Sequence, residues 1–130
     1  MATTLNISPE EKVTSFISGK HQMLVNGRWV DSASGKTFPT YNPATGEVLA
    51  KIAEGDREDI DRAAKAARNA FENGPWPRLT PSERGRLIWK LADLMEQHLE
   101  ELAEVESLDN GKPLKVARVA DVPLAVDLFR

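Results

Sequence analysis

The sequence contains no cysteine. This absence excludes disulfide bonds, thiolate metal sites and a cysteine nucleophile for these 130 residues. Histidine is scarce as well, because only His21 and His98 are present, and their separation does not match the spacing of a zinc site. Both histidines are interpreted as ordinary surface or partly packed imidazoles. Little of the usual chemistry for nucleophilic or metal-dependent catalysis is therefore available to this chain.

Long apolar runs and an excess of basic residues are also missing. No run approaches the roughly 20 residues that a membrane-spanning helix needs. The net charge is −3, and no basic block or aromatic–basic pattern indicates nucleic acid. The first twenty residues are polar, include Glu10 and Glu11, and do not resemble a signal or transit peptide. The sequence therefore predicts no nucleic-acid partner, no membrane partner and a cytoplasmic location.

Glycine-rich phosphate loops are absent too. Neither Gly-x-Gly-x-x-Gly nor Gly-x-x-x-x-Gly-Lys-Ser/Thr occurs, and the Gly-Lys-Pro at residues 111–113 is interpreted as a helix terminus. Glu96, Glu100 and Glu104 are spaced by four residues and are interpreted as one solvated row on a helix. Packing is the preferred explanation for the three tryptophans. The sequence thus predicts no catalytic and no cofactor-binding residue in this segment.

What is present fits a globular chain about one domain long, with 41% apolar and 28% charged residues. The alternation around Asn26 and Gly27 is typical of a β-hairpin, because this pair tolerates positive φ. The Pro-Ala-Thr-Gly at residues 43–46 predicts a second turn. Extended segments are predicted at residues 22–25, 28–31, 38–41 and 47–53.

Two helices have recognisable starts. Asp56 is predicted to cap the first, with acidic residues following in the first turn, and Gly74 and two prolines end it. Thr80 and Glu83 are predicted to form a capping box for the second helix, with proline at its first position. An apolar stripe then predicts one continuous helix that ends at residues 109–113.

The last segment is apolar and contains one proline. Pro123 is tolerated in the first turn of a helix, which predicts a helix that begins near Asp121. No glycine, asparagine or proline stop precedes Arg130. This pattern is typical of a truncated element, so the sequence predicts an incomplete domain.

Several short motifs occur in a fixed order. They are Val-Asn-Gly-Arg-Trp-Val at 25–30, Thr-Tyr-Asn-Pro-Ala-Thr-Gly-Glu at 40–47, Pro-Trp at 75–76, Ser-Glu-Arg-Gly-Arg at 82–86 and Leu-Asp-Asn-Gly-Lys-Pro at 108–113. In this order and spacing the motifs resemble the amino-terminal part of an NAD(P)-dependent aldehyde dehydrogenase. The resemblance covers roughly residues 22–130.

The resemblance implies an α/β fold: the amino-terminal part of the family's cofactor-binding domain, with a β-hairpin and short strands followed by long amphipathic helices. Residues 1–20, which precede the resemblance, are predicted to form a flexible arm. The resemblance implies a truncated portion of the domain at residues 21–130. In the family, a cysteine thiolate attacks the aldehyde and hydride passes to NAD or NADP. The catalytic cysteine, the general-base glutamate and the cofactor loop all lie downstream, so the isolated chain is predicted to be inactive. A homo-oligomer is implied for the full-length enzyme.

Two alternatives stay open at this point. The first alternative is a stand-alone, non-catalytic interaction module derived from the family, because the apolar faces of the last helices need a partner. A reductase of the same superfamily, acting on an acyl phosphate or thioester, suits the motifs less well.

The resemblance also implies two sites. Related enzymes bind a monovalent cation through a backbone oxygen near Thr40 and Tyr41 and the carboxylate of Asp109, and oxygen ligands suit such an ion. The alternative for Asp109 is a carboxylate bonded to the backbone at the end of a helix. Ala120 and Leu124 are expected at the substrate entrance, with core packing as the alternative.

Overall fold

The first β-hairpin forms around the predicted Asn-Gly turn. In the computed structural model, which describes residues 9–130, β1 (Met23–Val25) pairs antiparallel with β2 (Arg28–Val30). Asn26 and Gly27 have φ values of 52° and 72°, so both adopt the positive φ that a tight two-residue hairpin requires. The predicted strands and turn are confirmed.

The second hairpin joins β3 (Thr37–Tyr41) to β4 (Val48–Ala53). Its register shifts between Thr40 and Tyr41, so Leu49 is the extra residue on β4. In the turn, the Asn42 side chain accepts a hydrogen bond from the backbone N–H two residues further on, at 2.9 Å. The extended segments and the turn at residues 43–46 are therefore confirmed.

Both predicted capping residues initiate helices. Asp56 precedes α2 (Arg57–Asn73), and Thr80 precedes α3 (Pro81–Gln97), which follows the short 3-10 turn Trp76–Arg78. The Thr80 N–H donates to Glu83 Oε2 at 2.7 Å. Hydrogen bonds from the Thr80 backbone N–H and hydroxyl lower the pKa of Glu83. The capping box is confirmed.

The prediction of one continuous helix after Thr80 is wrong. His98, with φ −106° and ψ 21°, separates α3 from α4 (Leu99–Asn110). The break changes the direction of the chain, so that α3 packs against α6 while α4 packs against α1. No glycine or proline marks this position, and the apolar spacing continues across it, so the sequence carries no local signal for the break.

The last segment is helical from Leu114, seven residues before the predicted start. It consists of α5 (Leu114–Val116), a π turn labelled η2 (Ala117–Asp121) and α6 (Val122–Phe129). The Val122 N–H bonds to the Ala117 carbonyl, five residues back. Pro123 has no N–H, and its ring would clash with the carbonyl four residues earlier in an α-helix. The wider π turn therefore lets the helix continue past this proline.

Helix α1 (Pro9–Ser18) corrects the expectation of a flexible arm. The prediction is wrong for residues 9–18, and residues 1–8 lie outside the described residues. Val13 is buried, and Lys12 Nζ lies 2.5 Å from Glu101 Oε1, so α1 packs on α4. Proline at the first helical position and the acidic first turn are the start signals that could have revealed this helix.

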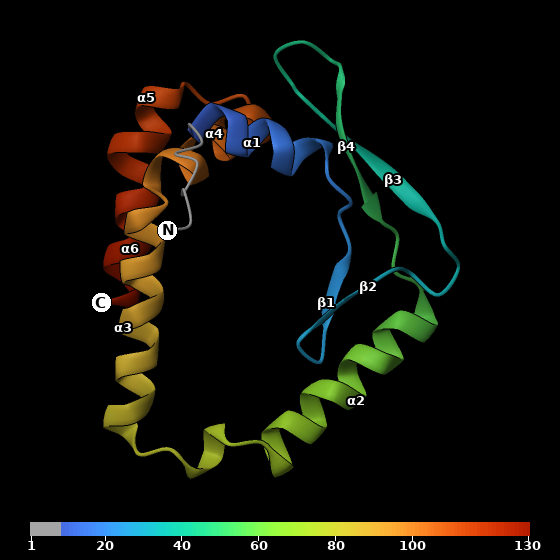
Figure 1. Cartoon of the computed structure of the whole chain (residues 1–130), viewed down its shortest axis with the longest axis vertical. Helices are drawn as coiled ribbons and strands as arrows, with labels where there is room; N and C mark the ends of the chain where they lie inside the picture. Colours follow the sequence, from blue (N-terminus) through green and yellow to red (C-terminus); the bar gives the residue numbers. More distant parts are fainter. Residues whose placement is uncertain (1–8) are drawn as a thin grey trace, which may run out of the picture.

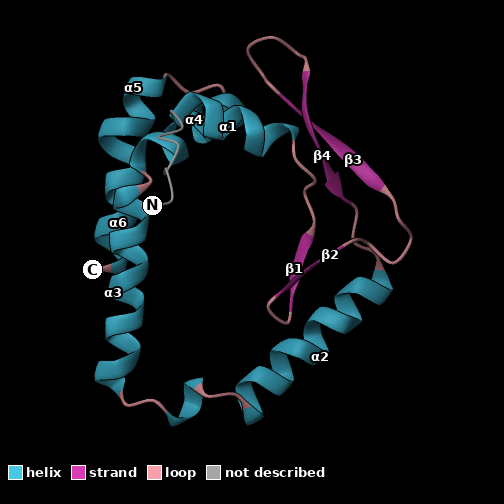
Figure 2. Cartoon of the chain, viewed as in Figure 1, coloured by secondary structure: helices cyan, strands magenta, loops and turns pink. Residues whose placement is uncertain are grey.

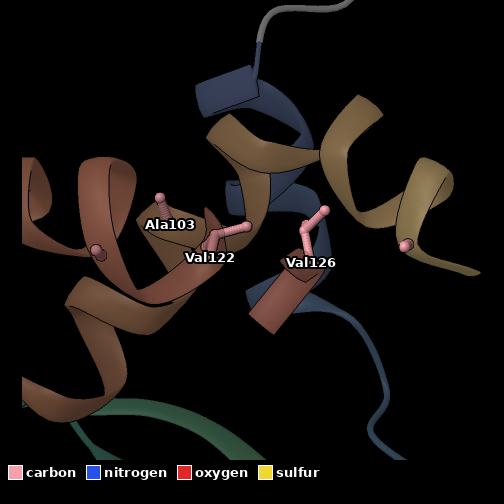
Figure 3. Close-up of a cluster of buried hydrophobic side chains, with 5 residues drawn as sticks. Ala103, Val122 and Val126 are labelled. Atoms are coloured by element: carbon pink, nitrogen blue, oxygen red, sulfur yellow. The ribbon is translucent and has the colours of Figure 1, made fainter. Parts of the chain in front are cut away.

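A small cluster of buried apolar side chains lies between α3, α4 and the last segment (Figure 3). It consists of Ala92, Ala103, Ala117, Val122 and Val126. Figures 1 and 2 show the hairpins on the side opposite to α3, with α2 running from the hairpins toward the start of α3.

Many large apolar side chains remain exposed. On α2 and α3 they are Ile60, Phe71, Leu87, Ile88, Trp89, Leu91 and Leu94. The chain is thus a mixed α/β fragment of a domain, as predicted. Within residues 9–130 no helix has the length and apolarity needed to cross a membrane.

Candidate functional site

The structure brings together β3 and the end of α4, which are far apart in the sequence. Thr40 Oγ1 donates a hydrogen bond to Asp109 Oδ1 at 3.1 Å. Tyr41 follows Thr40 at the shifted register of the hairpin, and its side chain is exposed. Two of the three residues predicted for a cation site are therefore in direct contact, and the third is adjacent in the chain.

A glycine allows this contact region to close. Gly111 ends α4 with φ 76°, a left-handed conformation that suits glycine. A Cβ atom at this position would lie 2.8 Å from Cγ of Pro43, which is closer than carbon atoms pack. The motif around Asn42 and the motif around Asp109 therefore meet at Gly111, and a side chain there would separate them.

The lysine near the end of α4 pairs with carboxylates other than Asp109. Lys112 Nζ lies 2.6 Å from Asp121 Oδ2 and 3.7 Å from Glu106 Oε1. The hydrogen bond with Asp121 is the main cause of a raised pKa of Lys112. Among residues 9–130, Asp109 forms no ion pair. Its carboxylate thus stays available to an external cation.

The oxygen atoms of Asp109 and Thr40 suit a hard monovalent cation better than a transition metal. A carboxylate and a hydroxyl supply oxygen ligands, and the end of a helix adds the negative partial charge of its carbonyls. Within residues 9–130, no group of three or more histidine, cysteine or acidic side chains is placed to hold a metal ion.

The two residues expected at the substrate entrance lie on the last segment. Ala120 is half-buried in η2, and Leu124 is 67% exposed in α6. Neither belongs to the buried cluster. Packing in the buried cluster therefore does not explain the apolar side chain of Leu124, which is exposed to solvent in this chain.

The sequence predicted that Glu96, Glu100 and Glu104 form one solvated row. Two of these three acidic side chains form ion pairs with the last segment. Arg118 lies 2.6 Å from Glu100, and Arg130 pairs with Glu96 and, at 3.0 Å, with Asp93. These side chains keep much of their exposure, yet they connect the last segment to α3 and α4. Sequence reasoning missed the pairing because the partners are distant in the chain.

A buried carboxylate that the sequence did not single out stands at the start of α2. Asp59 is 1% exposed and accepts hydrogen bonds from the N–H groups of Ala33, at 3.0 and 3.1 Å, and Asp56, at 3.1 Å. It also pairs with Arg62. Burial alone would raise the pKa of Asp59, but the two N–H groups and Arg62 outweigh it, so the pKa is lowered. This contact ties the loop after β2 to α2.

The N-termini of α2 and α3 are occupied by side chains of the chain itself. Phosphate groups are usually held by a free helix N-terminus or a glycine-rich loop. The N-termini of α2 and α3 are already capped by Asp56 with Asp59 and by Thr80 with Glu83. A carboxylate at each of these two ends would repel a phosphate.

Comparison with known proteins agrees with the motifs. The model of the aldehyde dehydrogenase family matches residues 29–130, so the chain belongs to the aldehyde dehydrogenase family. It is 52% identical over 128 residues to the mitochondrial aldehyde dehydrogenase family 2 member B4 of Arabidopsis thaliana. It is 48% identical over 122 residues to the mitochondrial benzaldehyde dehydrogenase of Antirrhinum majus.

A solved structure agrees over almost the whole chain. The aldehyde dehydrogenase of Bacillus cereus (E194S mutant) superimposes with a TM-score of 0.91 at 53% identity, over 96% of this chain and 26% of that protein. The NAD+ complex of the Bacillus cereus enzyme gives a TM-score of 0.90. The match to the Arabidopsis protein covers 98% of this chain but 24% of that protein. The chain thus spans about a quarter of the length of these relatives.

Proposed function

We propose that this chain is the amino-terminal part of an NAD(P)-dependent aldehyde dehydrogenase and forms one portion of its cofactor-binding domain. The proposal is supported chiefly by the superposition of almost the whole chain on a quarter of the Bacillus cereus enzyme. The exposed apolar faces of α2 and α3 agree with it, because a larger domain would cover them. The complete enzyme oxidises an aldehyde to a carboxylate with NAD or NADP as hydride acceptor, as a homo-oligomer in the cytoplasm.

The isolated chain is expected to show no aldehyde oxidation. Covalent catalysis needs an activated nucleophile, and this sequence has no cysteine. The test compares the pure chain with a chimera in which it replaces the matched quarter of the Bacillus cereus enzyme, by following NADH formation from acetaldehyde. The chimera should turn over at about 1–10³ s⁻¹, which is the common range for enzymes.

Two results would contradict the proposal: turnover by the pure chain, or a chimera that folds and binds NAD but is inactive. Replacing the catalytic cysteine of the chimera with serine provides the control, because activity must then disappear. The non-catalytic interaction module remains the second candidate, since apolar faces are exposed. Cooperative unfolding and a defined oligomer of the isolated chain would favour that module.

Thr40, Tyr41 and Asp109 are proposed to hold a monovalent cation, with Thr40 or Tyr41 contributing a backbone oxygen. The contact between Thr40 and Asp109 supports this assignment. Replacing choline chloride with sodium or potassium chloride at constant ionic strength should raise the thermal midpoint of the chimera, because a ligand that binds only the folded state stabilises it. Asp109→Asn should abolish the rise, while the control Asp61→Asn on α2 should keep it. An equal rise in Asp109→Asn would refute this assignment.

Ala120 and Leu124 are proposed to contact the aldehyde at its entrance. The exposure of Leu124 supports this role. In the chimera, Leu124→Ala should raise KM for a long-chain or aromatic aldehyde roughly tenfold or more. The reason is that one methylene group in an apolar pocket changes the specificity for a substrate by about 10–200-fold. KM for acetaldehyde should change little. The control is Leu128→Ala, which removes a leucine of α6 that is even more exposed, at 82% against 67% for Leu124. Identical profiles for the two variants would argue against a specific role of Leu124.

A further inference from the structure

Helix α1 contacts both parts of the chain that the bond between Thr40 and Asp109 joins. Figure 1 shows α1 between α4 and the β3–β4 hairpin, and α1 packs on both α4 and β4. Its apolar contact is small, because within residues 10–18 only Val13 is buried, and Ile17 is half-buried. The docking of α1 therefore depends on a few contacts at each of its ends.

At the start of α1, one carboxylate connects the helix to the break between α3 and α4. Glu101 Oε1 lies 2.5 Å from Lys12 Nζ, and Glu101 Oε2 lies 3.0 Å from His98 Nδ1. The hydrogen bond from Lys12, followed by the one from His98, lowers the pKa of Glu101, so the carboxylate is ionised at neutral pH. The ion pair with Lys12 thus holds this end of α1 on α4.

At the end of α1, the chain pairs with β4. The Ala53 N–H donates to the His21 carbonyl at 3.0 Å, and His21 forms a parallel bridge with Ile52. The His21 ring lies against α1, because its Nε2 is 3.1 Å from the Ile17 carbonyl and its centroid is 5.0 Å from that of Phe16, in an edge-on arrangement. This end of α1 is therefore bonded to the hairpin.

A cavity of about 340 Å³ lies between these elements. Its lining comes from the end of α1, the β3–β4 hairpin and α4, and it includes both Thr40 and Asp109. Atoms that face an empty space lose dispersion contacts, so the hairpin and α4 do not fix each other's position by close packing here. The separation of Thr40 from Asp109 therefore depends on the contacts around the cavity, and α1 supplies one of its walls.

Thr40 lies between two points at which the hairpin is held. Pro43, three residues after Thr40, lies close to Gly111 at the end of α4. Ile52, which bridges to the end of α1, is paired with Phe38, two residues before Thr40. A hairpin that is held at one point can pivot about it, and a second point prevents this motion. The contact with α1 thus restrains Thr40 in a way that the turn alone does not.

We propose that α1 is a positioning element, which holds the β3–β4 hairpin on α4 and so sets the contact between Thr40 and Asp109. This inference rests on the proposed function, because it concerns the cation site assigned to these residues, and it adds to that site a helix that supplies no ligand. A cation that needs both residues binds more tightly when α1 is docked. Coupling between two sites is reciprocal, so the cation also stabilises the docked helix by the same factor.

The test replaces Val13 with aspartate, which places a charge in the buried contact and should detach α1. Thr14→Asp is the matched control, because it adds the same charge at an exposed position of α1. Both variants are made in the full chain and in the chimera, and amide hydrogen exchange is measured in choline chloride. Exchange at residues 38–42 and 108–111 should become at least about fivefold faster in Val13→Asp and change little in Thr14→Asp. Equal exchange in the two variants would overturn the proposal.

Titration with sodium or potassium chloride tests the coupling. Half of the rise in the thermal midpoint should require at least about fivefold more salt in Val13→Asp than in Thr14→Asp, at constant ionic strength. In the unmodified protein, saturating cation should slow the exchange of residues 10–18 by a similar factor, and Asp109→Asn should abolish this slowing. Equal affinities of the two variants, or cation binding that leaves the exchange of α1 unchanged, would overturn the proposal.

A milder pair of variants serves if Val13→Asp does not fold. Lys12→Met removes the charge that pairs with Glu101, while Lys12→Arg keeps it. Lys12→Met should speed exchange first at residues 10–18 and, by a smaller factor, at residues 38–42, and Lys12→Arg should restore both. Faster exchange at residues 10–18 without any change at residues 38–42 would overturn the proposal. Unchanged exchange at residues 10–18 would overturn the role of the ion pair.

Failure of this proposal is distinguishable from failure of the proposed function. If neither sodium nor potassium raises the midpoint, the cation assignment fails, but the exchange in choline chloride still decides whether α1 positions the hairpin. If the cation binds both variants equally well, the cation assignment stands and the positioning role is wrong. An inactive chimera contradicts the proposed enzyme and leaves both comparisons measurable.

Discussion

Replacing Asp59 with alanine is expected to lower the thermal midpoint of the chain by about 5 °C or more. The side chain is 1% exposed and accepts hydrogen bonds from the N–H groups of Ala33 and Asp56. Alanine would leave these donors without their acceptor and would leave Arg62 without its partner. The loop after β2 should then detach from α2. Differential scanning calorimetry measures the midpoint, and hydrogen exchange at Ala33 identifies the loop.

The matched control is Asp61→Ala on the same helix. Asp61 is exposed and, among residues 9–130, pairs only with Lys65, at 2.6 Å, so its loss should change the midpoint by no more than about 1–2 °C. Equal losses for Asp59→Ala and Asp61→Ala would contradict the assigned role of the buried carboxylate.

The same carboxylate predicts how stability depends on pH. Hydrogen bonds from two backbone N–H groups and Arg62 outweigh burial and hold the pKa of Asp59 below its ordinary value of 3.8. The unfolded chain therefore binds the proton at a higher pH than the folded chain. The contribution of Asp59 to stability is fully present above that ordinary value and is lost as the pH falls through the lower pKa of the folded state. In Asp59→Asn the midpoint should depend less on pH over this acidic interval, and an unchanged dependence would contradict the argument.

Gly111→Ala is expected to destabilise the chain by about 1–3 kcal/mol. A left-handed φ costs a residue with a Cβ atom roughly 1–2 kcal/mol, and the new atom would also meet Pro43. Gly35→Ala is the control, because Gly35 has a similar φ of 69° but open space around it. Urea unfolding measures both variants, and the difference between them isolates the contact with Pro43.

A double-mutant cycle then tests the contact directly. Pro43→Ala should relieve part of the cost of Gly111→Ala, because it removes the ring atom that the new Cβ would approach. Two results together would contradict the packing of the turn on the end of α4. Gly111→Ala and Gly35→Ala would lose equal amounts of unfolding free energy, and the effects of Pro43→Ala and Gly111→Ala would be additive.

The local elements followed from the sequence wherever a short signal specified them. Asn26 and Gly27 specified a hairpin, and Thr80 with Glu83 specified a helix start, because each acts on atoms a few residues away. The break at His98 had no such signal. The helix at residues 9–18 has a start signal in Pro9 and the two acidic residues after it, within a segment that is otherwise polar.

The candidate site was less accessible to sequence reasoning. The resemblance assigned Thr40 and Asp109 to one cation site, but the residues themselves carry no signal for it, because their contact depends on how the hairpin meets the end of α4. Asp59 could not be separated from its neighbours Glu58 and Asp61 by pattern, since all three are acids near the start of a helix. Only the position of the loop containing Ala33 makes one of them a buried acceptor.

The π turn at residues 117–121 has a consequence for comparing sequences. Its geometry is that of an α-helix into which one residue has been inserted, with Ala117 and Val122 five positions apart yet both buried. A homologue with one residue fewer here could form a regular helix and keep both buried positions, provided that no proline followed. An alignment gap in this family can therefore fall inside a helix, and shifting it into the preceding loop would misassign every residue from Leu114 to Asp121.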